Sequence, residues 1–226
     1  MHHASASGLS RIDLLASLVA VASLLLVMLP HLNGGAQRRD RAICFGNLQQ
    51  LGIAVTAWSM DHEDRFPWLV SSLQGGSIGG QRVVDHWRPL SNHLRDVKFL
   101  TCPANPRRYA TSFASMQDHN MSYGVGSDSQ SGLPGSFLAS DFDLEGGYRT
   151  VCGIWGRGRP LGNVFGFSVI TGQPASATSS WSVTNHVRLG NILTADGSVH
   201  ATDTAGLRVI MSANSGHGGA CHYLPP

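Results

Sequence analysis

Residues 14–29 read LLASLVAVASLLLVML and contain no charged side chain. Extended back to Leu9, the run would form a helix about 31 Å long, which matches the hydrocarbon core of a bilayer. Pro30 and His31 follow without a small-residue cleavage site, which argues against a removable secretory signal peptide. We therefore expect residues 9–29 to span a membrane once.

An acidic residue, Asp13, lies near the start of this segment, two residues after Arg11. A carboxylate inside a spanning helix is costly and predicts a specific partner, whereas in a plain anchor it would only sit at the membrane surface. Beyond the span come Arg38, Arg39 and Arg41, and by charge count the C-terminal side would be cytoplasmic. Long C-terminal domains are often translocated regardless of such charges, so this count does not decide the orientation.

The composition leaves room for one anchor and one globular domain in 226 residues. Sixteen basic and fourteen acidic residues give a net charge of +2, which excludes a nucleic-acid binder that relies on a broad basic field. The sequence contains no nucleophile elbow, phosphate loop or paired-carboxylate motif, and we expect no enzyme. An enzyme that uses His186 and Asp196 is the weakest alternative.

Residues 8–15, GLSRIDLL, resemble the prepilin processing site of type IV pilins and type II secretion pseudopilins. The resemblance implies that a prepilin peptidase cuts between Gly8 and Leu9 and that the new amino terminus is methylated. It also implies that Asp13 stands where the family has a glutamate. Its carboxylate would then pair with the Leu9 amino group of a neighbouring subunit in a filament.

Four further motifs extend the resemblance along the chain. Residues 44–52, CFGNLQQLG, are similar to the C-x-x-N-L-K-Q-L-G segment of one pilin-like subfamily, and residues 99–103, FLTCP, to its Cys-Pro box. Residues 122–124 resemble its Ser-Tyr-Gly element. His186 is followed by nine residues and then Asp196-Gly197, the pattern of the prepilin-type H-X9-DG domain.

The resemblance implies a filament subunit in a type II secretion or type IV pilus-like system. Its partners would be copies of itself or other pilin-like subunits, prepilin peptidase, inner-membrane assembly machinery and membrane lipid, with no nucleic acid. The chain would cross the inner membrane once and hold its C-terminal domain in the periplasm or outside the cell. The alternative is a membrane-tethered extracytoplasmic binding module that never polymerises and presents Trp68, Trp87, Trp155 and Trp181 on loops to an envelope ligand.

We expect an α+β fold in which a long N-terminal helix packs on a small antiparallel sheet. Residues 1–8 would be the leader, 9–29 the transmembrane half of the helix, 30–64 its amphipathic half and 65–226 the globular domain. The helical spacing of five apolar residues predicts one buried face, while Pro30 and Gly34-Gly35 predict a bend or break at residues 31–36. The five are Cys44, Leu48, Leu51, Val55 and Trp58.

Shorter patterns predict elements of the globular domain. Residues 90–96 favour a short helix, and residues 136–140 and 164–171 favour strands. Residues 188–195 and 197–202 favour a hairpin that turns at Asp196-Gly197, a pair suited to a type I′ turn. In that interpretation His186, Asp196 and Gly197 are structural, with the histidine making a hydrogen bond.

The four cysteines, Cys44, Cys102, Cys152 and Cys221, permit three disulfide connectivities in an oxidising compartment, and the sequence does not choose among them. We expect no cofactor. Asp128, Asp141 and Asp143 could bind calcium through a loop, but no twelve-residue calcium loop is present. His217, Cys221 and His222 have a spacing found in zinc sites, and we expect a loose tail there instead.

Overall fold

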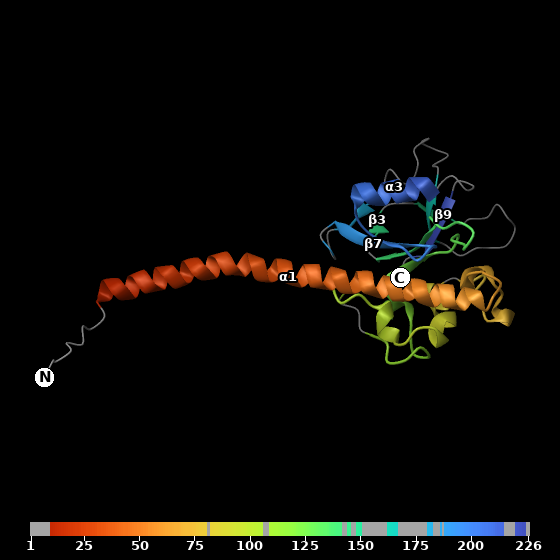
Figure 1. Cartoon of the computed structure of the whole chain (residues 1–226), viewed down its shortest axis with the longest axis horizontal. Coiled ribbons are helices and arrows are strands. Elements are labelled where there is room, and N and C mark those ends of the chain that lie inside the picture. The colour runs from red at the N-terminus through yellow and green to blue at the C-terminus, as the bar shows by residue number, and fades with distance from the viewer. Residues whose placement is uncertain are drawn as a thin grey trace. The chain divides into compact units, whose positions relative to one another are not determined.

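The computed structural model describes residues 10–80, 82–105, 109–141, 144–145, 148–150, 162–166, 180–182, 186, 188–214 and 220–224 (Figure 1). The chain divides into two compact units, Met1–Arg39 and Asp40–Pro226. The helices are α1 (Arg11–Met60), α2 (Val83–Trp87) and α3 (Thr204–Asn214). Short 3-10 helices are η1 (Pro67–Leu69), η2 (Ser72–Gln74), η3 (Arg88–Asn92), η4 (Val97–Leu100) and η5 (Asp118–Asn120).

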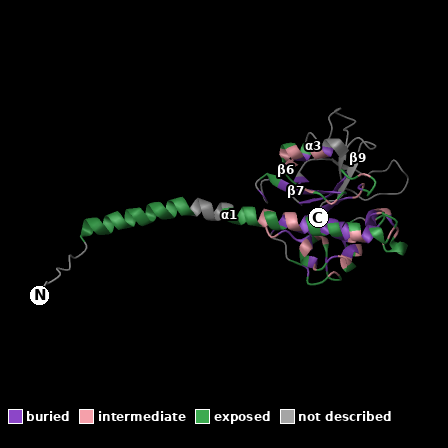
Figure 2. Cartoon of the chain, in the orientation of Figure 1, coloured by how far each residue is buried: buried purple, intermediate pink, exposed green. Residues whose placement is uncertain are grey.

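The N-terminal part of α1 is an exposed apolar helix. Its Arg11–Met28 stretch is long and apolar enough to cross a membrane. The large apolar side chains of this stretch face outward, with Ile12 76% and Leu26 72% exposed (Figure 2). Such a surface needs lipid or protein to cover it.

Helix α1 continues through Pro30 and Gly34-Gly35, so the predicted break at residues 31–36 is wrong. Proline removes one backbone donor and each glycine costs about 1 kcal/mol relative to alanine. These losses are local, and helix formation is cooperative along a long segment. The helix therefore spans all 50 residues from Arg11 to Met60.

The predicted buried face of α1 is confirmed. Cys44, Leu48, Leu51 and Val55 are fully buried and Trp58 is 3% exposed. The helix ends at Met60, and the amide of Asp64 donates to the Ser59 carbonyl, which closes the final turn. Glu63 and Asp64 then take positive φ angles of 59° and 56°, which a helix cannot continue through.

A seven-stranded antiparallel sheet has the order β4-β5-β9-β1-β2-β7-β8, and β3 and β6 form a separate pair. Strands β1, β2 and β7, which are neighbours in this order, are almost entirely buried. The predicted strands at 136–140 and 164–171 correspond to β2 and β5, although residues 167–171 lie outside the described residues. The strands are β1 (Tyr123–Gly126), β2 (Phe137–Asp141), β3 (Leu144–Glu145), β4 (Tyr148–Thr150), β5 (Gly162–Gly166), β6 (Ser180–Trp181), β7 (Leu189–Thr194), β8 (Val199–Asp203) and β9 (Ala220–Leu224).

Two apolar clusters divide the side chains of the central strands. Leu138 and Leu193 belong to the larger cluster, which also contains the buried face of α1 and the segment from Phe66 to Met121. Phe137 and Ile192 belong to the smaller cluster with Trp181 and two residues of α3, Leu207 and Met211. Neighbouring strand residues thus enter different clusters, because successive side chains point to opposite faces of a strand.

The hairpin of β7 and β8 is confirmed, but its turn is not type I′. Leu193 pairs with Val199, the Thr194 amide donates to Ser198 and the Gly197 amide donates to Thr194. Among these turn residues only Gly197 has a positive φ angle, 83°, whereas type I′ requires two. The connection is a three-residue loop in which glycine forms a bulge.

The predicted helix at residues 90–96 is also wrong. The chain instead forms α2 at Val83–Trp87 and then two 3-10 helices, η3 and η4, on either side of residues 93–96. Pro89 sits at the start of η3, where its missing donor is tolerated. Asp96 caps η4 by accepting the Lys98 amide at 2.9 Å, which separates η4 from η3.

Candidate functional site

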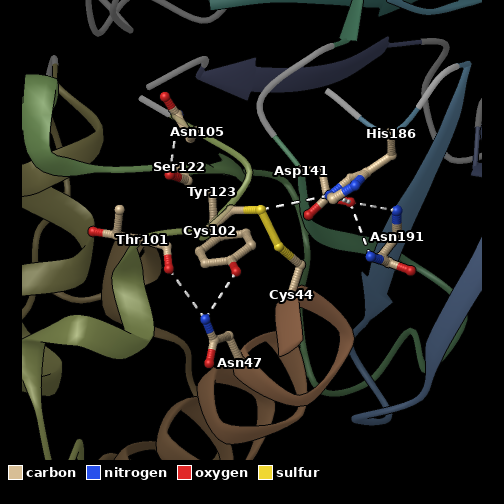
Figure 3. Close-up of a disulfide and its surroundings, with 10 residues drawn as sticks. All are labelled: Cys44, Asn47, Thr101, Cys102, Asn105, Ser122, Tyr123, Asp141, His186 and Asn191. Atoms are coloured by element: carbon tan, nitrogen blue, oxygen red, sulfur yellow. Dashed lines mark hydrogen bonds and ion pairs between the residues drawn. A yellow bond between two sulfur atoms is a disulfide. The ribbon is translucent and has the colours of Figure 1, made fainter. Parts of the chain in front are cut away.

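A disulfide joins α1 to the loop after η4, and the residues around it form the candidate site (Figure 3). Cys44 and Cys102 are bonded, with their Cα atoms 5.3 Å apart, and they lie 58 positions apart in the sequence. Both side chains are fully buried. Of the connectivities that the sequence left open, the structure selects one that contains this pair.

His186 lies beside the disulfide. Its Nε2 atom is 3.5 Å from the Cys102 Sγ atom and 3.9 Å from the Asp141 Oδ2 atom. The side chains of His186 and Asp141 are each only 1% exposed. The Asp141 Oδ2 atom also accepts hydrogen bonds from the Asn191 amide at 2.8 Å and from Asn191 Nδ2 at 3.0 Å, which fixes its position.

A second polar group lies on the other side of the disulfide. Asn47, one turn after Cys44 on α1, donates through Nδ2 to the Thr101 carbonyl and to the Tyr123 hydroxyl, each at 3.1 Å. The Ser122 amide donates to the Leu100 carbonyl at 2.8 Å. Figure 3 shows Tyr123 to the left of the disulfide and Asn47 below it, with His186 and Asp141 to its right.

Four motifs that are far apart in the sequence therefore meet at this site. Cys44 and Asn47 come from CFGNLQQLG, Cys102 from FLTCP, Tyr123 from the Ser-Tyr-Gly element and His186 from the H-X9-DG pattern. The sequence did not predict their convergence. It also missed Asp141 as a neighbour of His186 and Asn191 as the residue that holds Asp141, because Asp141 is far from both in the sequence and no local spacing connects them.

Burial controls the electrostatics of the site. Burial, followed by the nearby Arg41 charge, lowers the pKa of His186, and Asp40 opposes this in part. Burial, followed by the Asp141 charge, raises the pKa of Tyr123 well above its ordinary value. Both directions favour uncharged side chains next to the disulfide at neutral pH.

The ends of the H-X9-DG pattern do not share a site. His186 precedes β7 and contacts the disulfide, whereas Asp196 and Gly197 form the hairpin loop after β7. Asp196 Oδ1 accepts hydrogen bonds from Thr194 Oγ1 at 2.6 Å and the Ser198 amide at 3.0 Å. Burial raises the Asp196 pKa, but these hydrogen bonds outweigh it and lower the pKa overall. This arrangement places no acid–base pair at His186 and Asp196.

At the N-terminus, Asp13 caps its own helix. The Ser10 amide donates to Asp13 Oδ2 at 2.9 Å, and the Asp13 amide donates to Ser10 Oγ at 3.2 Å. This reciprocal pair is a capping box, which satisfies two donors at the start of α1. The Ser-x-x-Asp spacing could have predicted it. Gly8 and Leu9 lie outside the described residues.

Other predicted sites are only partly described. Asp141, one of the three calcium candidates, is buried against His186 and Asn191, while Asp143 lies outside the described residues. Cys152 and His217 also lie outside them. The loose tail expected around Cys221 and His222 is wrong, because both residues lie in β9, which pairs with β1 and β5. Only their backbone is described.

The tryptophans expected on ligand-binding loops are core residues instead, which corrects that part of the binding-module alternative. Trp68, Trp87 and Trp181 are 4%, 0% and 2% exposed. Their indole N–H groups donate to Ser129, Tyr123 and Thr202, respectively. Buried tryptophans with satisfied indoles stabilise a core and are not available to a ligand. Trp155 lies outside the described residues.

Comparison with models of known protein families finds no match to this chain. Searches of curated proteins and of solved structures also find no match.

Proposed function

We propose that this chain is a pilin-like or pseudopilin-like filament subunit of a type II secretion or type IV pilus-like system. It would be matured by prepilin peptidase and anchored in the inner membrane through residues 9–29, with its domain in the periplasm or outside the cell. Its role would be mechanical, and its partners would be other subunits of its kind.

One observation carries the proposal: α1 is a continuous helix with two different surfaces. Residues of the Arg11–Met28 stretch expose their apolar side chains, whereas from Cys44 onward one face enters the core cluster that also holds Val125, Leu138 and Leu193. A filament subunit needs both parts, because the first packs among lipids or neighbouring helices and the second joins the domain. We infer that this second part packs on the sheet.

The meeting of four family-like motifs around one disulfide also supports the proposal. Cys44, Asn47, Cys102 and His186 contact one another or share partners there. A motif set that resembles a family by chance would have no reason to converge on one buried site. The resemblance therefore gains support from residues outside the N-terminal processing segment.

The capping role of Asp13 favours a second candidate, a membrane-tethered module that does not polymerise. In that case the carboxylate would only accept a hydrogen bond from the Ser10 backbone N–H and stabilise the start of the helix. The filament proposal also requires the negative charge of the Asp13 carboxylate. An unpaired charge in an apolar layer costs several kcal/mol, so a neighbour's Leu9 amino group would need the Asp13 carboxylate.

Substitutions that separate capping from charge distinguish the two candidates. Asp13→Asn keeps an oxygen for the Ser10 amide but removes the charge, and Asp13→Glu keeps the charge. Ser10→Ala removes the hydroxyl from the cap and leaves the charge of Asp13 intact. We expect Asp13→Asn and Asp13→Ala to abolish high-mass cross-linked species in native membranes, and Asp13→Glu and Ser10→Ala to retain them.

All four variants should insert and be processed like the parent, because Asp13 lies far from the core cluster in sequence. Immunoblots of membrane fractions and electron microscopy of sheared cells provide the measurements. Assembly by Asp13→Asn at the parent level would mean that capping is the whole role of Asp13, and the tethered module would be the better account.

A further inference from the structure

The disulfide, His186 and Asp141 place four metal-ligand side chains in one buried cluster. Within the described residues, Cys44, Cys102 and His186 offer ligand atoms that all lie within 4.8 Å of one another. Asp141 Oδ2 lies 3.9 Å from His186 Nε2. All four side chains belong to the unit Asp40–Pro226, so the cluster does not depend on how the two units are arranged.

We propose that the dithiol form of this chain binds a divalent transition metal, preferentially zinc, through Cys44, Cys102, His186 and Asp141. The disulfide and the metal would then be alternative occupants of one site. The proposal is independent of the pilin-like function, because it needs neither processing nor assembly.

The observed spacing fits tetrahedral coordination. With Zn–S bonds of about 2.3 Å and Zn–N bonds of about 2.0 Å, a tetrahedral site separates sulfur from nitrogen by about 3.5 Å. Cys102 Sγ and His186 Nε2 are 3.5 Å apart. The same geometry separates nitrogen from oxygen by about 3.3 Å, close to the 3.9 Å between His186 and Asp141. Asp141 is not in the group of three residues whose ligand atoms lie within 4.8 Å of one another, so its carboxylate would also have to move toward the sulfur atoms.

The largest adjustment is between the two sulfur atoms. They are 2.05 Å apart in the disulfide and would have to separate to about 3.8 Å around zinc. Reduction breaks the bond that holds them together, after which rotation about each Cα–Cβ bond can move the sulfur atoms apart. The backbone does not need to move by a comparable distance, because its Cα atoms are already 5.3 Å apart.

The surroundings supply the support that a metal ligand needs. Asn191 donates two hydrogen bonds to Asp141 Oδ2, from its backbone N–H at 2.8 Å and from its side-chain Nδ2 at 3.0 Å. Such hydrogen bonds orient ligating carboxylates in metal sites. Two thiolates with an imidazole and a carboxylate form a donor set that suits zinc and disfavours calcium or magnesium, which prefer oxygen ligands.

The chemistry balances with a dithiol or phosphine as reductant. The disulfide accepts two electrons and two protons and becomes two thiols. A dithiol supplies both and becomes a disulfide, whereas a phosphine supplies the electrons and becomes a phosphine oxide, with water supplying the oxygen atom and the two protons. Metal binding then displaces one proton from each thiol to water as the thiolate bonds form. Reoxidation by an added small-molecule disulfide transfers the two electrons to that disulfide, which takes two protons from water and becomes two thiols, and the metal is released.

Cobalt(II) provides the probe, because a tetrahedral thiolate site gives it intense d–d bands and a sulfur-to-metal charge-transfer band. Full-length protein in detergent is first reduced with a phosphine and then titrated with cobalt. We expect one equivalent to bind to the reduced protein with these bands, zinc to displace it, and the unreduced protein to show neither band. Reduced protein without the bands would overturn the proposal.

Variants identify the ligands. His186→Ala should weaken cobalt binding at least tenfold and alter the d–d bands, whereas His119→Ala, at an exposed position, should leave both unchanged. Cys152→Ser/Cys221→Ser should retain the full signal, which excludes the remaining cysteines as the source. If that double variant loses the signal, or His186→Ala keeps it, cobalt is binding elsewhere and the proposed site is wrong. Because each variant retains the Cys44–Cys102 disulfide before reduction, its folding can be checked by circular dichroism in the oxidised state.

Discussion

The Nε2 atom of His186 lies 3.5 Å from the Sγ atom of Cys102, although 84 residues separate them in the sequence. The histidine that opens the H-X9-DG pattern therefore contacts the disulfide and not the Asp-Gly turn that closes the pattern. Nine intervening residues carry the chain along β7, so the two ends of the motif perform different tasks. One end packs on a covalent cross-link, and the other reverses the chain.

The Cys44–Cys102 disulfide should contribute strongly to the stability of the domain. A cross-link that spans 58 residues restricts the unfolded chain by about 4 kcal/mol in the chain-entropy model. Cys44→Ala/Cys102→Ala should lower the free energy of unfolding by roughly that amount, measured by urea denaturation in detergent. With a phosphine reductant and no metal, the parent should fall to nearly the stability of the variant. If the parent and the variant differ in unfolding free energy by the same amount with and without reductant, the disulfide is not the cause of that difference.

Gly190 should not tolerate a side chain. A Cβ atom there would lie 2.6 Å from three ring atoms of Trp181, which is itself buried in the smaller cluster. We expect Gly190→Ala to destabilise the domain by about 2 kcal/mol, as overpacking a core commonly does. Gly132→Ala is the matched control, because nothing lies within 4 Å of its Cβ position. Equal urea midpoints for the two variants would contradict the packing of Trp181 on β7.

His86 should make the protein sensitive to mild acid. Its ring is buried, with Nδ1 2.8 Å from Ser77 Oγ, and burial lowers its pKa to about 4. Between pH 6.5 and 4 the unfolded state takes up a proton that the folded state does not. The free energy of unfolding should therefore be unaffected by His86 above pH 6.5 and fall by about 3 kcal/mol as the pH drops to 4.

His86→Gln keeps a hydrogen-bonding group near Ser77 and removes the titration. Its unfolding free energy should decline less steeply between pH 6.5 and 4 than that of the parent. Part of the slope should remain, because burial also lowers the pKa of His186. His119→Gln, at an exposed position, should follow the parent curve. If the unfolding free energies of the parent and His86→Gln depend on pH in the same way, the pKa of His86 is the same in the folded and unfolded states.

Gly8 should be required for processing if the N-terminal segment is a prepilin leader. The expected peptidase pocket accepts glycine, and a branched side chain would clash with it, so Gly8→Val should leave full-length precursor in the membrane. Intact-mass spectrometry should find the parent beginning at a methylated Leu9. Gly35→Ala, with nothing within 4 Å of its Cβ position, should mature normally. Mature-sized Gly8→Val protein would contradict the processing interpretation.

Local patterns predicted much of the secondary structure. The spacing of Cys44, Leu48 and Leu51 predicted the buried face of α1, because helical periodicity repeats along the sequence itself. The hairpin at Asp196-Gly197 was predicted from the turn preference of Asp-Gly, which is also a local signal. The prediction failed at residues 31–36, where helix formation depends on the sum of many small free-energy contributions along the chain. Pro30 and the two glycines predicted a bend or break, but their local cost did not outweigh helical continuity on both sides, and the helix is unbroken.

The sequence by itself determined the apolar span at residues 14–29, the four cysteines and the order of the motifs. Only the tertiary structure decided that Cys44 bonds to Cys102, that His186 joins them and that Trp68, Trp87 and Trp181 are core residues. The physical reason is the distance along the sequence over which each kind of signal acts. Periodicity, turn chemistry and hydropathy act between residues a few positions apart, whereas the site is assembled by burying residues that lie 58 and 84 positions apart, and no local pattern records which of them will meet.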